Sequence, residues 1–219
     1  MKTLLRSWFL VGLAIPLEAE MPQPEVKIEI LVYNYAGLPA VTLAGAERET
    51  ARIYQRAGIR TEWRDCPLRS DEAAQFPGCQ VPITPTRLAL QILPRSMAER
   101  DGLYKATFGS ALCPEDGGFG MTALVCAPCV AQLAKGREEM HAVILGSVMA
   151  HELGHLLLGS GSHGATGLMH TPWHRWELER ISQGLMLFTS WEGERMQAQI
   201  LARAGQREWA QSSVPSPRQ

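Results

Sequence analysis

The amino-acid sequence predicts an α+β fold, in which a sheet of about four strands packs on two long helices. The first half of the chain holds segments in which apolar residues alternate with polar ones, as in half-buried strands. Leu43–Ala57 has the apolar spacing of a helix, and Glu138–Leu158 is apolar almost all round, which is typical of a buried helix. The length of 219 residues suffices for one domain with a hydrophobic core.

The chain begins with the features of a secretory signal peptide, predicted over residues 1–19. Lys2 and Arg6 form a charged start, and the apolar core Trp8–Leu17 is too short to span a membrane as a helix. Leu17-Glu18-Ala19 offers a small-residue cleavage site. We therefore expect a secreted or periplasmic protein with no membrane association in its mature form.

The predicted strands and the first helix follow in order. The strands are Val26–Asn34, Ile59–Asp65, Arg87–Pro94 and Phe119–Cys126. The helix Leu43–Ala57 ends at Gly58, a residue type that commonly follows a helix C-terminus. Residues 66–85 are rich in Pro, Asp and Gly and are predicted to form a loop.

The C-terminal part is predicted to be helical. Thr171 followed by Pro172 is a favourable helix start, and Thr189 with Glu192 three residues later forms a capping box. The last helix is expected to end at Gly205. We assign residues 20–205 to one catalytic domain and residues 206–219, which are polar and end in Ser and Pro, to a disordered tail.

The most informative motif is His151-Glu152-Leu153-Gly154-His155, which has the pattern H-E-x-x-H. Residues four apart share one face of a helix, so the two imidazoles can reach one metal ion. Two neutral imidazoles suit Zn²⁺, and Glu152 lies where it can act as a general base toward water without binding the metal. The alternative is an ordinary surface helix, but the surrounding residues are apolar, and buried polar groups need a partner.

The residues after this motif sharpen the prediction. Gly159 is a suitable helix end, Ser160-Gly161-Ser162 is typical of a turn, and His163 and Met169 follow. This order resembles the metzincin clan of zinc peptidases, whose pattern is H-E-x-x-H-x-x-G-x-x-H with a downstream Met-turn. Here the glycine comes four residues after His155 instead of three, and the third His comes eight after it instead of six.

The resemblance implies a metzincin-like fold: a twisted mixed sheet packed on two long helices, with helices after the Met-turn. It implies that His151, His155 and His163 hold Zn²⁺ and that Met169 forms an apolar floor under the metal. It also implies that a peptide substrate pairs along an edge strand, which we place at Gly118–Cys126. The alternative is that this strand lies inside the sheet and that Met169 is a plain core residue.

Glu177 is the competing third ligand, because thermolysin-like peptidases complete their zinc site with a carboxylate from a later helix. The early helix end at Gly159 and the position of Met169 favour His163. The neighbouring His170 and His174 are expected at the surface or just behind the site.

All five cysteines lie between Cys66 and Cys129, and in an exported protein we expect disulfides. Cys66 is expected to bond to Cys79, and Cys113 to either Cys126 or Cys129, which leaves one thiol unpaired. The C-x-x-C motif Cys126–Cys129 leaves open a redox pair or, with Cys113, a second zinc site.

We therefore predict an exported zinc-dependent endopeptidase that uses Glu152 as its general base. A non-catalytic exported binding domain stabilised by zinc is the alternative, and a thiol-redox protein is a third possibility. The net charge of −1 gives no electrostatic reason to expect a nucleic-acid partner. Substrate specificity and oligomeric state are not predicted.

Overall fold

The computed structural model describes residues 25–103, 108–114 and 120–212, with side chains up to residue 205. The predicted signal peptide lies outside the described residues. The strands are β1 (Lys27–Asn34), β2 (Arg60–Asp65), β3 (Arg87–Leu93), β4 (Gly109–Leu112) and β5 (Thr122–Cys126). The helices are α1 (Ala40–Arg56), α2 (Pro77–Gln80), α3 (Arg95–Arg100), α4 (Ala127–Leu133), α5 (His141–Leu158), α6 (Arg175–Ser182) and α7 (Ser190–Ser212). The predicted α+β class is confirmed.

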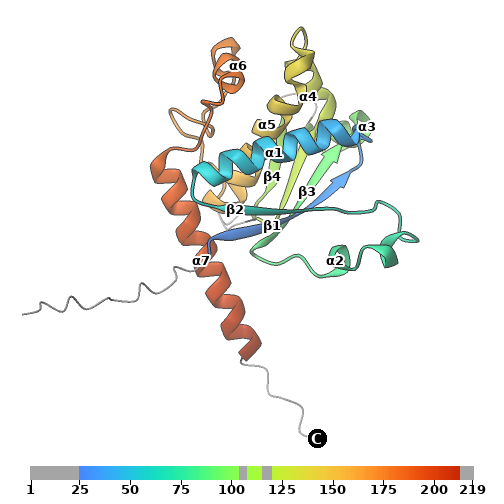
Figure 1. Ribbon diagram of the computed structural model, residues 1–219, viewed down its shortest axis with the longest axis vertical. Coiled ribbons are helices and arrows are strands. Elements are labelled where there is room, and N and C mark those ends of the chain that lie inside the picture. Colours follow the sequence, from blue (N-terminus) through green and yellow to red (C-terminus); the bar gives the residue numbers. More distant parts are fainter. Residues whose placement is uncertain (1–24, 104–107, 115–119, 213–219) are drawn as a thin grey trace, which may run out of the picture.

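The five strands form one mixed sheet in the order β2-β1-β3-β5-β4 (Figure 1). β1 pairs parallel with β2 and β3, and β5 pairs parallel with β3. β4 alone among the described strands runs antiparallel, paired with β5 from Gly109–Val125 to Leu112–Thr122. A mixed sheet with one antiparallel strand at its end is the result.

The prediction that Gly118–Cys126 is an edge strand is wrong in its placement. The described part of that segment, β5, has β3 on one side and β4 on the other; residues 118 and 119 lie outside the described residues. This end of the sheet is instead formed by β4, a strand that was not predicted from the sequence. Its residues, Gly-Ser-Ala-Leu, are mostly small and lack the alternating branched side chains that identify a strand.

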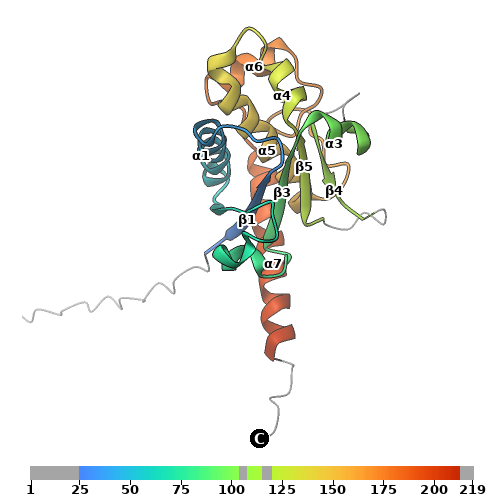
Figure 2. The same cartoon turned by 90° about the vertical axis from the view of Figure 1, so that its right-hand side faces the viewer.

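One face of the sheet carries the main hydrophobic core, because alternate residues of a strand point to the same side. Ile28, Ile30 and Val32 of β1 and the matching residues of β3 and β5 pack with the buried sides of α1 and α5. Figure 2 shows α1 and α5 beside the strands. A second, smaller cluster includes Leu93 of β3 and Leu124 of β5, which pack with Ala98 of α3.

Close contact between α1 and α5 fixes the position of α5. A Cβ on Gly146 would lie 2.5 Å from the carbonyl oxygen of Ala46, and one on Gly45 would lie 2.9 Å from Cβ of Ala142. Because neither glycine has a side chain, the two backbones approach closely. The buried Thr50 hydroxyl donates to the carbonyl of Gly146 at 2.8 Å.

Helix α5 with the short 3-10 turn before it, Glu138–Leu158, has the length and composition of a membrane-spanning helix. However, 83% of its most apolar window is buried inside the protein. It is therefore the core helix of the domain. At its end, the buried guanidinium of Arg203 in α7 donates to the carbonyls of Leu156 at 2.6 Å and of Pro85 at 2.9 Å.

Two predicted boundaries in the C-terminal part are wrong. α6 begins at Arg175 rather than Pro172, because Glu177 caps it by accepting the backbone N–H of His174 at 2.8 Å. α7 runs through Gly205 to Ser212, since good helix formers follow that glycine and one glycine in a helix costs only about 1 kcal/mol. Residues 206–212, predicted to belong to a disordered tail, are therefore helical, and residues 213–219 lie outside the described residues. The capping box of Thr189 and Glu192 is present at the start of α7.

The cysteines form two pairs. Cys66 bonds to Cys79 as predicted, with their Cα atoms 5.7 Å apart. Cys126 bonds to Cys129, so the predicted pairing of Cys113 with either of them is wrong. The physical reason is local: Cys126 is the N-cap of α4 and Cys129 lies in its first turn, which brings the Cα atoms within 5.2 Å. Both bonds are of a kind that persists in oxidising compartments.

Candidate metal centre

Helix α5 places the first two histidines of the motif on one face. His151 and His155 are each 8% exposed, and their Nε2 atoms lie 3.1 Å apart. This closeness follows from their four-residue spacing, which stacks side chains one turn apart. The two imidazoles therefore point into the same small volume.

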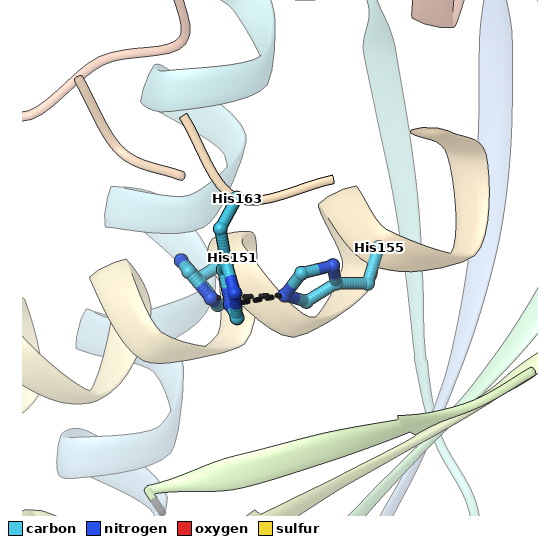
Figure 3. A group of neighbouring side chains, drawn as sticks. All are labelled: His151, His155 and His163. Atoms are coloured by element: carbon cyan, nitrogen blue, oxygen red, sulfur yellow. Dashed lines mark hydrogen bonds between the residues drawn. The ribbon is translucent and has the colours of Figure 1, made fainter. Parts of the chain in front are cut away.

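His163 reaches this volume from the loop after α5. Gly159 and Gly161 both adopt positive φ, at 94° and 71°, a conformation that residues with a side chain rarely take. The chain thus turns back, and Nε2 of His163 lies 3.1 Å from Nε2 of His155 (Figure 3). One nitrogen from each of the three histidines lies within 4.8 Å of the others.

The donor set fits a zinc ion. Ligands at about 2.0–2.1 Å in tetrahedral geometry lie about 3.3–3.4 Å from one another, close to the Nε2 separations seen here. Nδ1 of His151 lies 2.8 Å from the carbonyl oxygen of Leu168, which can only accept, so Nδ1 carries the proton and Nε2 has a free lone pair. Unprotonated nitrogens facing each other repel, and a cation between them removes the repulsion.

Burial keeps these imidazoles neutral, which is the form that binds a metal. Loss of solvent lowers the pKa of His151 to about 4, and burial together with the neighbouring histidines lowers the pKa of His155 to about 3. Burial also lowers the pKa of His163. All three are therefore ready to bind a cation at neutral pH.

Glu152 lines the same pocket as the histidines and is 6% exposed. Its side chain lies against β4: a Cβ on Gly109 would lie 2.6 Å from Cγ of Glu152. Burial raises the pKa of the Glu152 carboxyl to about 8, so it can hold and release a proton near neutral pH.

The pocket has a volume of about 370 Å³ and lies between α5, β4 and the segment after Met169. Phe108–Ala111 and Val148 line the pocket, together with Thr171, Pro172 and Trp173. A cavity of this size takes a side chain or a small ligand.

Met169 is fully buried beneath α5. Its sulfur lies 2.9 Å from the position of a Cβ on Gly154, so the glycine inside the motif leaves room for this side chain. Figure 3 shows the three imidazoles pointing toward one another, two from helix α5 and one from the loop after it. The position is compatible with the predicted apolar floor, which stays a prediction.

Glu177, the competing ligand, does not belong to the histidine cluster in the described part of the chain. Its carboxylate caps α6, and it also lies 3.6 Å from Nδ1 of His170. His174, the N-cap of α6, is exposed.

Sequence reasoning missed two side chains beside the cluster. Trp173 meets the ring of His151 edge-on at 5.6 Å between centroids, and its Nε1 donates to the carbonyl of His170 at 2.7 Å. Ser162, assigned only to a turn, lies 2.9 Å from Nδ1 of His155. The signal that could have identified Ser162 and Trp173 is their position in the segments that follow the H-E-x-x-H motif.

Comparison with solved structures shows the fold. Archaemetzincin from Methanopyrus kandleri is similar with a TM-score of 0.51 and 14% identity, covering 83% of this chain and 99% of its own. TM1509 from Thermotoga maritima is more distant, with a TM-score of 0.32, 9% identity and coverage of 88% and 99%. No family model and no curated protein matches. The chain therefore shares its fold with archaemetzincin and carries a cluster of three histidines that could hold a metal.

Proposed function

We propose that this protein is an exported zinc-dependent endopeptidase. The observation that carries the proposal is the convergence of three Nε2 atoms in a pocket that Glu152 also lines. The fold similarity to archaemetzincin supports it independently.

His151, His155 and His163 would hold the zinc ion. Zinc bound by three protein ligands acts as a Lewis acid that polarises a carbonyl oxygen and acidifies water. Three ligands, rather than four, are typical of catalytic sites, whereas structural zinc sites are closed. Within the described part of the chain the cluster holds three histidines, a number that favours a catalytic role.

Glu152 would move the proton. Its carboxylate accepts a proton from the attacking water and then donates it to the departing amine nitrogen of the peptide. The raised pKa assists the second transfer, because burial favours the protonated form. The positive charge of a bound metal would favour the first transfer, in which water loses a proton to Glu152.

The peptide would pair with β4, because β5 lies inside the sheet. Among the described residues no strand pairs with the other side of β4, and Gly109–Ala111 lines the pocket. An extended peptide can add to such an edge by main-chain hydrogen bonds. Gly109 brings the edge close to Glu152, and the scissile bond would lie there.

Export is supported by the Cys66–Cys79 and Cys126–Cys129 bonds, and by the predicted signal peptide. The alternative function, a zinc-stabilised binding domain without catalysis, shares the same metal centre. Glu152 favours catalysis, since a structural site has no use for a carboxylate that is buried beside the metal ligands at a cost.

The test compares the purified wild type with Glu152→Gln. We expect about one zinc per chain in both, and cleavage of an unstructured protein substrate by the wild type alone. Removing the metal with a chelator should abolish cleavage, and adding zinc should restore it. A wild type that binds zinc but cleaves nothing in a broad peptide library would support the binding domain instead, and full activity in Glu152→Gln would refute the mechanism.

A further inference from the structure

The loop after α5 contains a hydrogen bond to one of the three histidines from a residue that is not itself a metal ligand. Oγ of Ser162 lies 2.9 Å from Nδ1 of His155. Ser162 is half-buried and directly precedes His163, whereas Ser160 of the same loop is exposed.

Two glycines place this hydroxyl. Gly159 ends α5 with a φ of 94°, and Gly161 has a φ of 71° with no atom within 4 Å of a built Cβ. Gly161 is therefore required by its backbone conformation and not by a close contact. The two turns direct the chain back over α5, so that the hydroxyl of Ser162 lies beside the ring of His155.

A ring that binds a metal through Nε2 must carry its proton on Nδ1. The carbonyl of Leu168 imposes this form on His151, because a carbonyl only accepts. At His155 the hydroxyl of Ser162 lies 2.9 Å from Nδ1, and a backbone hydrogen bond with Gly159 also acts on the ring. A serine hydroxyl can accept a hydrogen bond from Nδ1–H and also prevents the ring from turning over.

We propose that Ser162 is a positioning residue, which holds His155 as the Nδ1–H tautomer with Nε2 directed at the metal centre. This inference rests on the proposed zinc site. The loop is two residues longer than the metzincin spacing, and in this chain the longer loop supplies both a ligand, His163, and the residue that orients another ligand.

The test measures zinc affinity by competition with a chromophoric chelator. Ser162→Ala should bind zinc about 10–100-fold more weakly, the usual loss when an orienting partner is removed. Ser162→Thr, which keeps the hydroxyl, should restore most of the affinity. Ser160→Ala is the matched control in the same loop and should bind as the wild type does.

A second readout uses the metal-free protein, whose imidazole nitrogens are observed by ¹⁵N NMR. In the metal-free protein an Nε2–H of His155 can donate to Nε2 of His151, and the hydroxyl of Ser162 opposes that form. The wild type should therefore hold a larger share of His155 as the Nδ1–H tautomer than Ser162→Ala does, with unchanged circular dichroism. Equal zinc affinity and equal tautomer in Ser162→Ala and Ser160→Ala would overturn the inference, as would a folded Ser162→Thr as weak as Ser162→Ala.

The two proposals fail in different ways. A wild type that binds no zinc would refute the proposed function, while the tautomer of His155 still decides whether Ser162 orients the ring. A wild type that binds zinc tightly, with an affinity that does not depend on Ser162, would refute this inference alone.

Discussion

Both halves of helix α5 are largely buried, but different contacts bury them. The first half, His141–Ala150, packs on α1 through small residues and the hydroxyl of Thr50. The second half, His151–Leu158, brings two imidazoles and a carboxyl into a pocket. One half stabilises the fold, and the other carries polar groups whose burial costs free energy. Substitutions in the first half should therefore lower the stability of the fold and leave metal binding unchanged. Substitutions in the second half should weaken metal binding and leave the stability of the metal-free fold unchanged.

The largest expected effect is on metal binding in the second half. His155→Ala should reduce zinc affinity by much more than the about 10–100-fold typical of an orienting partner, because a ligand is lost. The metal-free variant should unfold at about the same denaturant concentration as metal-free wild type, since a buried imidazole is removed. Chelator competition and urea unfolding measure the two quantities. Marked destabilisation of the metal-free variant would contradict the comparison.

A substitution in the first half of α5 should lower the stability of the fold but leave zinc affinity nearly unchanged. Gly146→Val forces a side chain against the carbonyl of Ala46, and we expect a loss of about 1–3 kcal/mol in the free energy of unfolding. Zinc affinity of the folded fraction should stay within a fewfold of wild type. Gly205→Val is a suitable control, because no atom lies within 4 Å of a Cβ at that position. Equal destabilisation by the two variants would show that the α1–α5 contact is not close.

The buried carboxyl should make the stability of metal-free protein depend on pH. Because the pKa of Glu152 is raised from its ordinary 4.5 to about 8 in the folded state, the folded protein binds more protons between these values. Its contribution is fully present below about pH 4.5 and is lost as pH rises toward 8, with a slope of at most about 1.4 kcal/mol per pH unit.

The comparison of wild type with Glu152→Gln isolates this slope, best between pH 6.5 and 8. Below pH 6.5 the lowered pKa values of His151 and His155 act in the opposite direction, since their contribution is lost as pH falls. Urea unfolding across this range is the measurement. Parallel curves for the two proteins would show that the carboxyl is ionised in the metal-free fold.

The smallest expected effect belongs to one hydrogen bond. Thr50→Val keeps the shape of a fully buried side chain but leaves the carbonyl of Gly146 without this donor. We expect a loss of about 1 kcal/mol in unfolding free energy and unchanged zinc affinity. Thermal unfolding measures the loss of stability, and a zinc titration measures the affinity. A loss of both stability and zinc affinity would contradict this prediction.

Prediction from the sequence succeeded where the signal is local. The strands near Val26–Asn34 and Arg87–Pro94, the long apolar helix, the Thr189 capping box and the Cys66–Cys79 bond each depend on residues close in the chain or on strong patterning. The spacing of His151 and His155 likewise implies their closeness once a helix is assumed.

It failed where the answer depends on distant partners. β4 has a short, small-residue sequence, and pairing with β5 rather than its own pattern makes it a strand. The start of α6 depends on the carboxylate of Glu177, which the sequence analysis had considered as a metal ligand. The hydrogen bond of Ser162 requires the backbone turn at Gly161, which composition alone does not specify.

The most direct test of the metal centre compares zinc affinity in His163→Ala and Glu177→Ala. Our account predicts that His163→Ala loses zinc severely, because a nitrogen of the three-histidine cluster is removed. Glu177→Ala should keep wild-type affinity, although loss of the cap on α6 lowers its stability. If Glu177→Ala loses the metal and His163→Ala keeps it, the three-histidine centre is refuted.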